Sequence, residues 1–216
     1  MLAAALRQTG LRVIRFYRAP WSTNCERLAI ALAHKGLTAE SVWIDYSDRS
    51  VIERASGQPL VPVVDFDGEV VFDSTRILRR LEQLHPDPPL FPRDPARRAE
   101  LSIFLEWFNE LWKRPPNEIE AELGRPETDV AKIERLTERM DRWLDLAEAM
   151  LDGRNFLFGS ELSAADCAAY PFLKFAAGRD PGDTELFHRI LDERQSTAGR
   201  PRLAGWIDRV SRLPQA

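Results

Sequence analysis

The first residues that could do chemistry are Ser22, Thr23 and Cys25, which stand where an apolar run gives way to a helical pattern. The start of a helix gathers unpaired N–H groups and a partial positive charge, so it stabilises an anion placed there. Thr23 and Glu26 have the spacing of a capping box, in which each side chain protects a backbone donor of the other. In that interpretation Ser22 lies just outside the helix, with a hydroxyl free to point at a ligand.

Cys25 is a second candidate in this segment, because a thiolate is a good nucleophile. A redox cysteine lies before or at the start of its helix, where the dipole lowers the thiol pKa. We place Cys25 about two residues inside the helix and therefore expect a buried structural cysteine. Tyr17, at the end of the preceding strand, could also donate a hydrogen bond to a thiolate. A tyrosine in a strand is more often an aromatic residue of the protein interior than a ligand-binding residue.

Two further segments offer backbone groups as well as side chains. Pro62 stands at the start of an apolar run, and proline cannot donate to a strand ladder. A cis Val61–Pro62 bond would expose the N–H and C=O of Val61 to a peptide-like ligand, whereas a trans edge proline is the alternative. Asp73 and Ser74 open a helix and are caps by default, but the same N–H groups can hold a ligand carboxylate while Asp73 meets its ammonium.

The elements that must position these residues follow the order β-α-β-α-β-β-α. Strands are predicted at 11–17 and 41–46 and on either side of Asp67-Gly68, and helices at 23–36, 48–56 and 74–85. The Asp67-Gly68 pair favours a tight hairpin turn, because both central residues must tolerate positive φ. This order is the thioredoxin arrangement, so residues 11–86 are predicted to form a thioredoxin-like domain.

A linker and an all-helical domain follow. Residues 87–95 are rich in proline, which stiffens the chain and indicates an extended linker. The remaining residues, 96–216, show helical spacing and no strand pattern. Helices are predicted at 95–114, 127–152, 163–177, 184–194 and 201–213, and Ser163 and Asp166 resemble a capping box. The predicted fold class is an α/β domain followed by an all-α domain.

Composition excludes several classes of protein. Of the 216 residues, 44% are apolar and 30% charged, which is ordinary for a globular chain, and no stretch approaches the roughly 20 apolar residues of a membrane-spanning helix. The net charge is -4, and the basic residues are interleaved with acidic ones. This distribution argues against nucleic acid and anionic membranes as partners. It is compatible with a small neutral or anionic ligand.

The cysteines and histidines form no recognisable site. Cys25 and Cys167 are far apart, which gives no disulfide framework and suits a reducing cytoplasm. No metal is expected from the widely spaced histidines, His34, His85 and His188. Residues 1–10 lack the features of a signal peptide, and we interpret them as a disordered or mis-started tail.

Taken together, these segments resemble the soluble glutathione transferase superfamily. The resemblance rests on PWSTNCERLAIAL, VPVVDFDGEVVFDS and FLFGSELSAADCAAYPFL, in that order, and covers about residues 11–177. It implies a cis Pro62, backbone pairing of the glutathione cysteinyl unit with Val61, and binding of the γ-glutamyl group by Asp73 and Ser74. It also implies that the box at Ser163 is a folding element of the second domain.

In the serine-type classes of this superfamily, a serine near the start of the first helix stabilises the thiolate, and the match falls on Ser22. The sequence departs from the family pattern at Asp73, where Glu or Gln is more usual, and at Leu60, where a polar residue often precedes Val-Pro. The candidates for binding the glycyl carboxylate are Arg49, Arg54 and Gln58.

The resemblance implies a bacterial-like, serine-type glutathione transferase in which glutathione is a co-substrate and no cofactor is needed. Ser22 would be catalytic, and Thr23 would join the glutathione-binding residues. Trp21, Trp107, Phe108 and Trp112 would form the second-substrate pocket, although aromatics at helical spacing are more often core. The family further implies a cytoplasmic homodimer active in detoxification. The alternatives are a non-catalytic binding or scaffold protein, and a glutathione-dependent thiol reductase or dehalogenase that uses Cys25.

Overall fold

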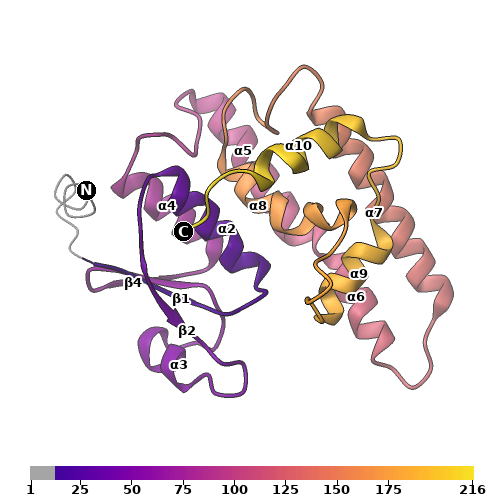
Figure 1. The fold of residues 1–216 in the computed structure, drawn as a ribbon, viewed down its shortest axis with the longest axis horizontal. Coiled ribbons are helices and arrows are strands. Elements are labelled where there is room, and N and C mark those ends of the chain that lie inside the picture. The colour runs from indigo at the N-terminus through magenta and orange to yellow at the C-terminus, as the bar shows by residue number, and fades with distance from the viewer. Residues whose placement is uncertain (1–12) are drawn as a thin grey trace. The chain divides into compact units, whose positions relative to one another are not determined.

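The computed structural model describes residues 13–216, and the chain divides into two units (Figure 1). Unit 1 comprises the described residues up to Arg93 together with Leu213–Ala216, and unit 2 comprises Asp94–Arg212. The prediction for residues 1–10 falls outside the described part of the chain. None of the helices found between residues 13 and 216 has both the length and the apolar character needed to cross a membrane.

Unit 1 is built on a mixed sheet with the predicted element order. Its elements are β1 (Ile14–Arg18), α2 (Thr23–His34), β2 (Glu40–Trp43), α3 (Ser50–Ser56), β3 (Val63–Phe66), β4 (Glu69–Phe72) and α4 (Ser74–Leu84). The strand order is β2-β1-β3-β4, with β1 parallel to β2 and antiparallel to β3. The sheet therefore has the thioredoxin-like topology that the sequence predicts.

The alternation of side chains explains how this sheet is covered. On β1, Ile14 and Phe16 are buried while Arg15 is exposed, as expected for a strand whose successive side chains point to opposite faces. Figure 1 shows α2 and α4 on one face of the sheet and α3 on the other. The hairpin between β3 and β4 turns at Asp67 and Gly68, whose φ angles of 55° and 100° confirm the predicted turn.

Unit 2 is entirely helical in its regular structure. It contains α5 (Pro95–Trp107), the π-helical turn η2 (Phe108–Trp112), α6 (Arg114–Leu123), α7 (Val130–Met150), α8 (Ala164–Leu173), the 3-10 turn η3 (Lys174–Ala177), α9 (Leu186–Arg194) and α10 (Pro201–Ser211). Every residue of α8 is buried, so this helix forms the centre of the unit. The fold class is the predicted one, an α/β unit and an all-α unit.

The sequence prediction was wrong about one stretch of unit 2. The single helix predicted over 95–114 stays α-helical only to Trp107 and then widens into η2, and the helix α6 was missed. The predicted helix ends directly before Pro115 and Pro116, and proline usually breaks a helix. Both prolines lie in the first turn of α6, where an N–H has no partner within the helix, so their missing donors cost nothing there.

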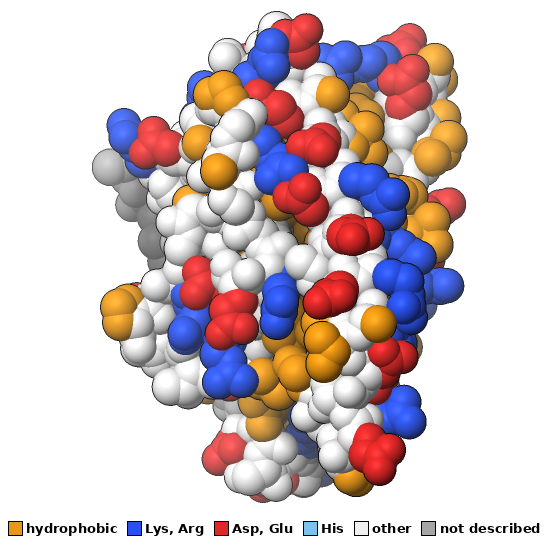
Figure 2. Space-filling model, turned by 90° about the vertical axis from the view of Figure 1, so that its right-hand side faces the viewer, with side chains coloured by type: hydrophobic (Ala, Val, Ile, Leu, Met, Phe, Trp, Pro, Cys, Tyr) orange, Lys and Arg blue, Asp and Glu red, His pale blue; other side chains and the backbone are white. Residues whose placement is uncertain are grey.

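Charged side chains of both signs cover the face of the molecule that Figure 2 shows. Lys and Arg lie interspersed with Asp and Glu, and apolar side chains emerge between them. This distribution agrees with the interleaving of basic and acidic residues along the sequence. Exposed ion pairs such as Arg212–Asp208 contribute little to stability.

Candidate functional site

Three chain segments meet at one end of the sheet in unit 1. Because β1 and β3 are antiparallel with Tyr17 opposite Val63, the end of β1 lies beside the start of β3. The hairpin pairs Val63 with Phe72, so the end of β4 lies at the same place. The segments attached to these three strand ends carry Ser22, Val61 and Asp73. The register therefore brings the three predicted parts of the site to one end of the sheet.

Ser22 is the N-cap of α2. Its Oγ accepts a hydrogen bond from the Cys25 N–H at 3.3 Å, and its C=O accepts from the Glu26 N–H at 2.9 Å. The predicted capping box at Thr23 is wrong, because the helix begins one residue earlier and Thr23 is its buried first residue. The Ser22 hydroxyl is an acceptor in the cap, so its proton is available to a ligand.

Cys25 lies on the third residue of α2 and is only 2% exposed. Burial raises the pKa of its thiol, and hydrogen bonds with the Ser22 hydroxyl and the Ala19 backbone, together with the charge of Arg18, oppose this only in part. A protonated, covered thiol is a poor nucleophile. The expectation of a buried cysteine is confirmed, and Cys167 is likewise buried and free of any disulfide.

Val61 presents its backbone to the site. The Val61–Pro62 bond is cis, as predicted. Neither the N–H nor the C=O of Val61 bonds to any residue that the structure describes. Leu60 is fixed just before it, because the Gln58 side chain donates to the Leu60 C=O at 2.9 Å and accepts from the Leu60 N–H at 2.8 Å. The Val61 side chain and Tyr17 both pack against an apolar cluster, formed by Ile44, Ile52 and Val63.

Asp73 and Ser74 begin α4 and leave several polar groups unpartnered. Oδ1 of Asp73 accepts from the backbone of Thr75 at 3.0 Å and of Arg76 at 2.9 Å. Its Oδ2 and the Ser74 N–H make no hydrogen bond within the described part of the chain. The Ser74 Oγ accepts from Nη1 of Arg27 at 3.0 Å, which leaves its own proton to give. The free carboxylate oxygen of Asp73 can accept from the ammonium of an α-amino acid. The N–H and O–H of Ser74 can donate to its carboxylate.

Arg27 was missed by the sequence prediction. Its side chain is completely buried, although arginine is almost never fully buried unless it is paired. The sequence signal is faint: a cation directly before Leu28, which begins the apolar spacing of α2. Its partner Ser74 lies 47 residues away, so only the fold brings the two together.

The three candidates for binding the glycyl carboxylate differ in how many hydrogen bonds their side chains already make. Gln58 is committed to Leu60, and Arg49 donates to the C=O groups of Tyr46 and Pro59. Arg54 is exposed on α3, and its side chain makes no hydrogen bond to a residue in the described range. Arg54 is thus the least engaged of the three, and its role stays a prediction.

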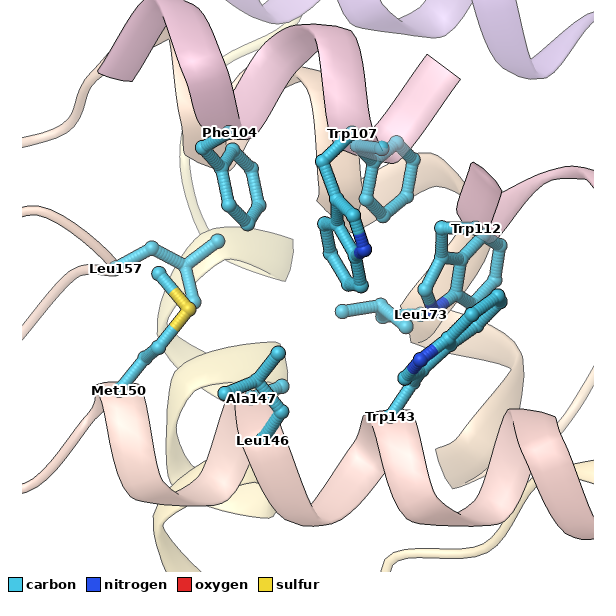
Figure 3. Close-up of a pocket in the computed structure, with 10 residues that line it drawn as sticks. Phe104, Trp107, Trp112, Trp143, Leu146, Ala147, Met150, Leu157 and Leu173 are labelled. Atoms are coloured by element: carbon cyan, nitrogen blue, oxygen red, sulfur yellow. The ribbon is translucent and has the colours of Figure 1, made fainter. Parts of the chain in front are cut away.

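The residues predicted to form a second-substrate pocket lie in both units. Trp107, Phe108 and Trp112 line one apolar pocket of unit 2, together with side chains of α7 (Figure 3). Its free space is about 10 Å³, roughly the room that one water molecule needs. Phe108 and Trp112 stack with centroids 4.7 Å apart and are buried, as core residues are. Trp21 lies in unit 1 with φ of 58° and is 50% exposed, and its share in such a pocket stays a prediction.

Comparison with known proteins gives matches to both units. Residues 16–89 match the family described as Glutathione S-transferase, N-terminal domain, and residues 130–209 match Glutathione S-transferase, C-terminal domain. The chain is 36% identical over 83 residues to a probable maleylacetoacetate isomerase of Caenorhabditis elegans, covering 37% of this chain and 39% of that protein. It is 33% identical over 109 residues to FtsZ-localized protein A of Caulobacter vibrioides, covering 46% and 47%. The matched segments span less than half the length of these two relatives.

A solved structure extends the likeness in fold to nearly the whole chain. It is a glutathione S-transferase from Methylobacterium radiotolerans in complex with glutathione sulfonate, with a TM-score of 0.73 and 24% identity, covering 95% of this chain and 96% of that one. The two family matches fall on the sheet-containing unit and on the helical unit in the order that the sequence predicted. The chain belongs to the glutathione S-transferase superfamily.

Proposed function

We propose that this chain is a serine-type glutathione transferase, which ionises the thiol of glutathione and passes the thiolate to a small electrophile. The observation that carries the proposal is a set of polar groups at one end of the sheet that have no partner among the described residues. They are the backbone of Val61, Oδ2 of Asp73, and the N–H and O–H of Ser74. A γ-glutamyl-cysteinyl peptide has a complement for each: the N–H and C=O of its cysteinyl unit, its ammonium, and the two oxygens of its α-carboxylate.

In the proposed binding mode, the cysteinyl unit of glutathione pairs with the N–H and C=O of Val61 as an added strand would. The ammonium of the γ-glutamyl group meets Oδ2 of Asp73, and its carboxylate accepts from the N–H and O–H of Ser74 at the start of α4. Thr23, the first residue of α2, would complete the site. The cysteinyl sulfur then lies toward the N-cap of α2.

At that N-cap the Ser22 hydroxyl donates to the thiolate, and the helix N-terminus adds a favourable partial charge. The thiol proton leaves to water, the sulfur forms a bond to the electrophile, and the leaving group departs with its electron pair. Lowering the thiol pKa by about 2 units from roughly 8.5 corresponds to about 2.7 kcal/mol of preferential thiolate stabilisation.

The second substrate, the cellular setting and the assembly belong to the same proposal. An apolar electrophile would meet aromatic side chains that have exposed surface, whereas Phe108 and Trp112 are buried as core residues are. Trp107 is the best placed of those in unit 2, because it is only partly buried. Cys25 and Cys167 are buried and form no disulfide, which suits a reducing cytoplasm. By analogy with its family the chain would act there as a homodimer in detoxification.

Substitution of Ser22 tests the catalytic role. In the wild-type protein, bound glutathione should ionise about 2 pH units below the free thiol, as followed by the ultraviolet absorbance of the thiolate. Ser22→Ala should raise this midpoint toward about 8.5, because the hydroxyl donor is gone. Ser102→Ala is the matched control, since the Ser102 hydroxyl lies in unit 2 and donates to the C=O of Arg98 in its own helix. An unchanged midpoint in Ser22→Ala would overturn the role of Ser22.

Two rival functions are separated by the same measurements. The first rival is a binding or scaffold protein without transferase activity; one relative, FtsZ-localized protein A, is named for its localisation and not for a reaction. Absence of glutathione binding by calorimetry would favour it and would overturn the proposed function. A thiol reductase or dehalogenase would need Cys25 as its nucleophile, and the burial and raised pKa of this thiol argue against that role. Full activity in a Cys25→Ser variant would exclude it.

A further inference from the structure

The guanidinium of Arg27 carries a positive charge next to Ser74, the first residue of α4. This group remains protonated at any physiological pH, and the Arg27 side chain has no exposure to solvent. Nη1 donates to the Ser74 Oγ at 3.0 Å, so a side chain from α2 contacts the first residue of α4. Ser74 is itself only 7% exposed.

The direction of this hydrogen bond determines what Ser74 can offer a ligand. A serine hydroxyl has one proton and two lone pairs, and Arg27 occupies a lone pair. Across the described residues, the Ser74 Oγ makes no other hydrogen bond. Its proton is therefore free to point away from the guanidinium, so that the hydroxyl can donate to a ligand at the site. A hydrogen bond from a charged donor also polarises the hydroxyl and strengthens it as a donor.

We infer that Arg27 is a positioning residue that makes the start of α4 selective for the α-carboxylate of an amino-acid group. It acts through Ser74, by fixing the hydroxyl as a donor and by adding a positive charge one hydrogen bond behind it. The ligand class is a thiol peptide with a free α-amino-acid head group. The inference rests on the proposed function, because it refines how the γ-glutamyl end of glutathione is recognised.

The competing role for Arg27 is that of a tie between two helices. A buried hydrogen bond from α2 to α4 would hold the helices together whatever ligand is bound. Such a tie would affect every ligand of the site equally, since it would act through the integrity of unit 1. A role in carboxylate recognition affects only ligands that carry the carboxylate. Selectivity between two ligands therefore distinguishes the two roles, whereas affinity for one ligand does not.

The test compares glutathione with γ-aminobutyryl-cysteinylglycine, which keeps the amino group and lacks the α-carboxylate. Dissociation constants are measured by calorimetry for the wild-type protein and for Arg27→Met and Arg27→Lys. We expect Arg27→Met to weaken glutathione by about tenfold or more, as for loss of a charge-assisted hydrogen bond, and to change the analogue by less than about threefold. Arg27→Lys keeps the charge and should restore part of the selectivity.

A double-mutant cycle keeps the inference testable if Arg27→Met does not fold. In a Ser74→Ala background, Arg27→Lys should cause no further loss of selectivity, because the hydroxyl through which it acts is absent. Arg200→Met is the matched control: Arg200 is the buried arginine of unit 2 that bonds Asp141 and Asp145, so its loss should lower stability without changing selectivity. The midpoint of thiolate ionisation should stay unchanged in every folded Arg27 variant, because Ser22 is intact.

Equal weakening of both ligands by the Arg27 substitutions would overturn the inference and leave Arg27 as a helix tie. Unchanged affinity for both would overturn it as well. If the wild-type protein binds the two ligands equally, the amino-acid subsite does not exist, and the inference fails with it. That result differs from a failure of the proposed chemistry, which would appear in the ionisation of bound glutathione while the carboxylate selectivity persisted.

Discussion

The helices α4 and α8 begin with the same type of residue pair, a serine and an aspartate, and use it in different ways. At α8, the Asp166 carboxylate accepts four hydrogen bonds: from the Leu157 N–H at 2.8 Å, from Trp206 Nε1 at 2.9 Å, and from the N–H and Oγ of Ser163 at 2.9 and 2.7 Å. At α4, Asp73 accepts two from its own first turn, and its Oδ2 has no partner in the described structure.

Burial explains the difference. Asp166 is completely buried, and a buried polar group left unpaired is expensive, so each of its oxygens is satisfied by the protein. Burial raises the pKa of Asp166, and the four donors oppose the rise. Asp73 is exposed, so water can occupy its open oxygen until a ligand displaces it. The fully hydrogen-bonded carboxylate of Asp166 stabilises the fold. The exposed carboxylate of Asp73, with one oxygen without a protein partner in the described structure, is available for binding.

The same substitution at both aspartates provides the sharpest contrast, and its largest effect is expected at Asp166. In Asp166→Asn the amide nitrogen faces donors that had met a carboxylate oxygen, so buried donors are left unpaired. We expect the free energy of unfolding to fall by about 3–4 kcal/mol. Urea unfolding followed by circular dichroism measures it, with Asp129→Asn as the control, because Asn caps a helix as well as Asp. A loss below about 1 kcal/mol would show that the network tolerates an unpaired donor.

At Asp73 the same change should affect binding and leave the fold almost intact. Asparagine keeps the cap on Thr75 and Arg76 but removes the charge that the proposed site directs at an ammonium. We expect glutathione to bind about 10- to 100-fold more weakly, as for loss of a hydrogen bond to a charged group. Calorimetric titration measures this, and unfolding should change by less than about 0.5 kcal/mol. Unaltered affinity would place the ammonium elsewhere.

The sequence predicted most of this contrast because both networks rest on local patterns. The box of Ser163 and Asp166 has capping spacing, and the structure confirms that both of its hydrogen bonds form. Asp73 and Ser74 follow the predicted hairpin and stand at the start of the next predicted helix. The contributions of Leu157 and Trp206 to Asp166 could not be predicted, because those residues reach it from 9 and 40 positions away.

The errors have the same physical origin. From sequence, a capping box of Thr23 and Glu26 and a simple N-cap at Ser22 fit equally well. Only the backbone of the structure shows that Ser22 is the N-cap, with extended φ and ψ directly before the helix. Arg27 reads as an ordinary exposed cation until α4 is packed against α2. Local patterns thus located the starts of α4 and α8, and tertiary packing determined which of their polar groups have no partner among the described residues.

His85 tests whether an unpartnered polar atom is enough to define an open site. It lies beside Lys35, whose buried Nζ donates to Glu82 and to the Pro88 C=O, and its own Nε2 has no partner among the described residues. Unlike the Asp73 Oδ2, this atom is buried. Burial and the charge of Lys35 lower the pKa of His85, so the native protein resists protonating it. By the burial argument, His85 should affect stability and not ligand binding.

The sign of its pH dependence follows from linkage. Below about pH 6.5 an unfolded histidine takes up a proton while native His85 stays neutral until its lower pKa is reached, so stability falls as pH falls through that window. One group contributes a slope of at most about 1.4 kcal/mol per pH unit. His85→Phe should remove this part of the slope in urea unfolding and leave glutathione affinity unchanged, with His34 and His188 cancelling in the comparison. An unchanged slope would mean that native His85 takes up protons as readily as the unfolded chain, and burial would then not be what separates it from Asp73.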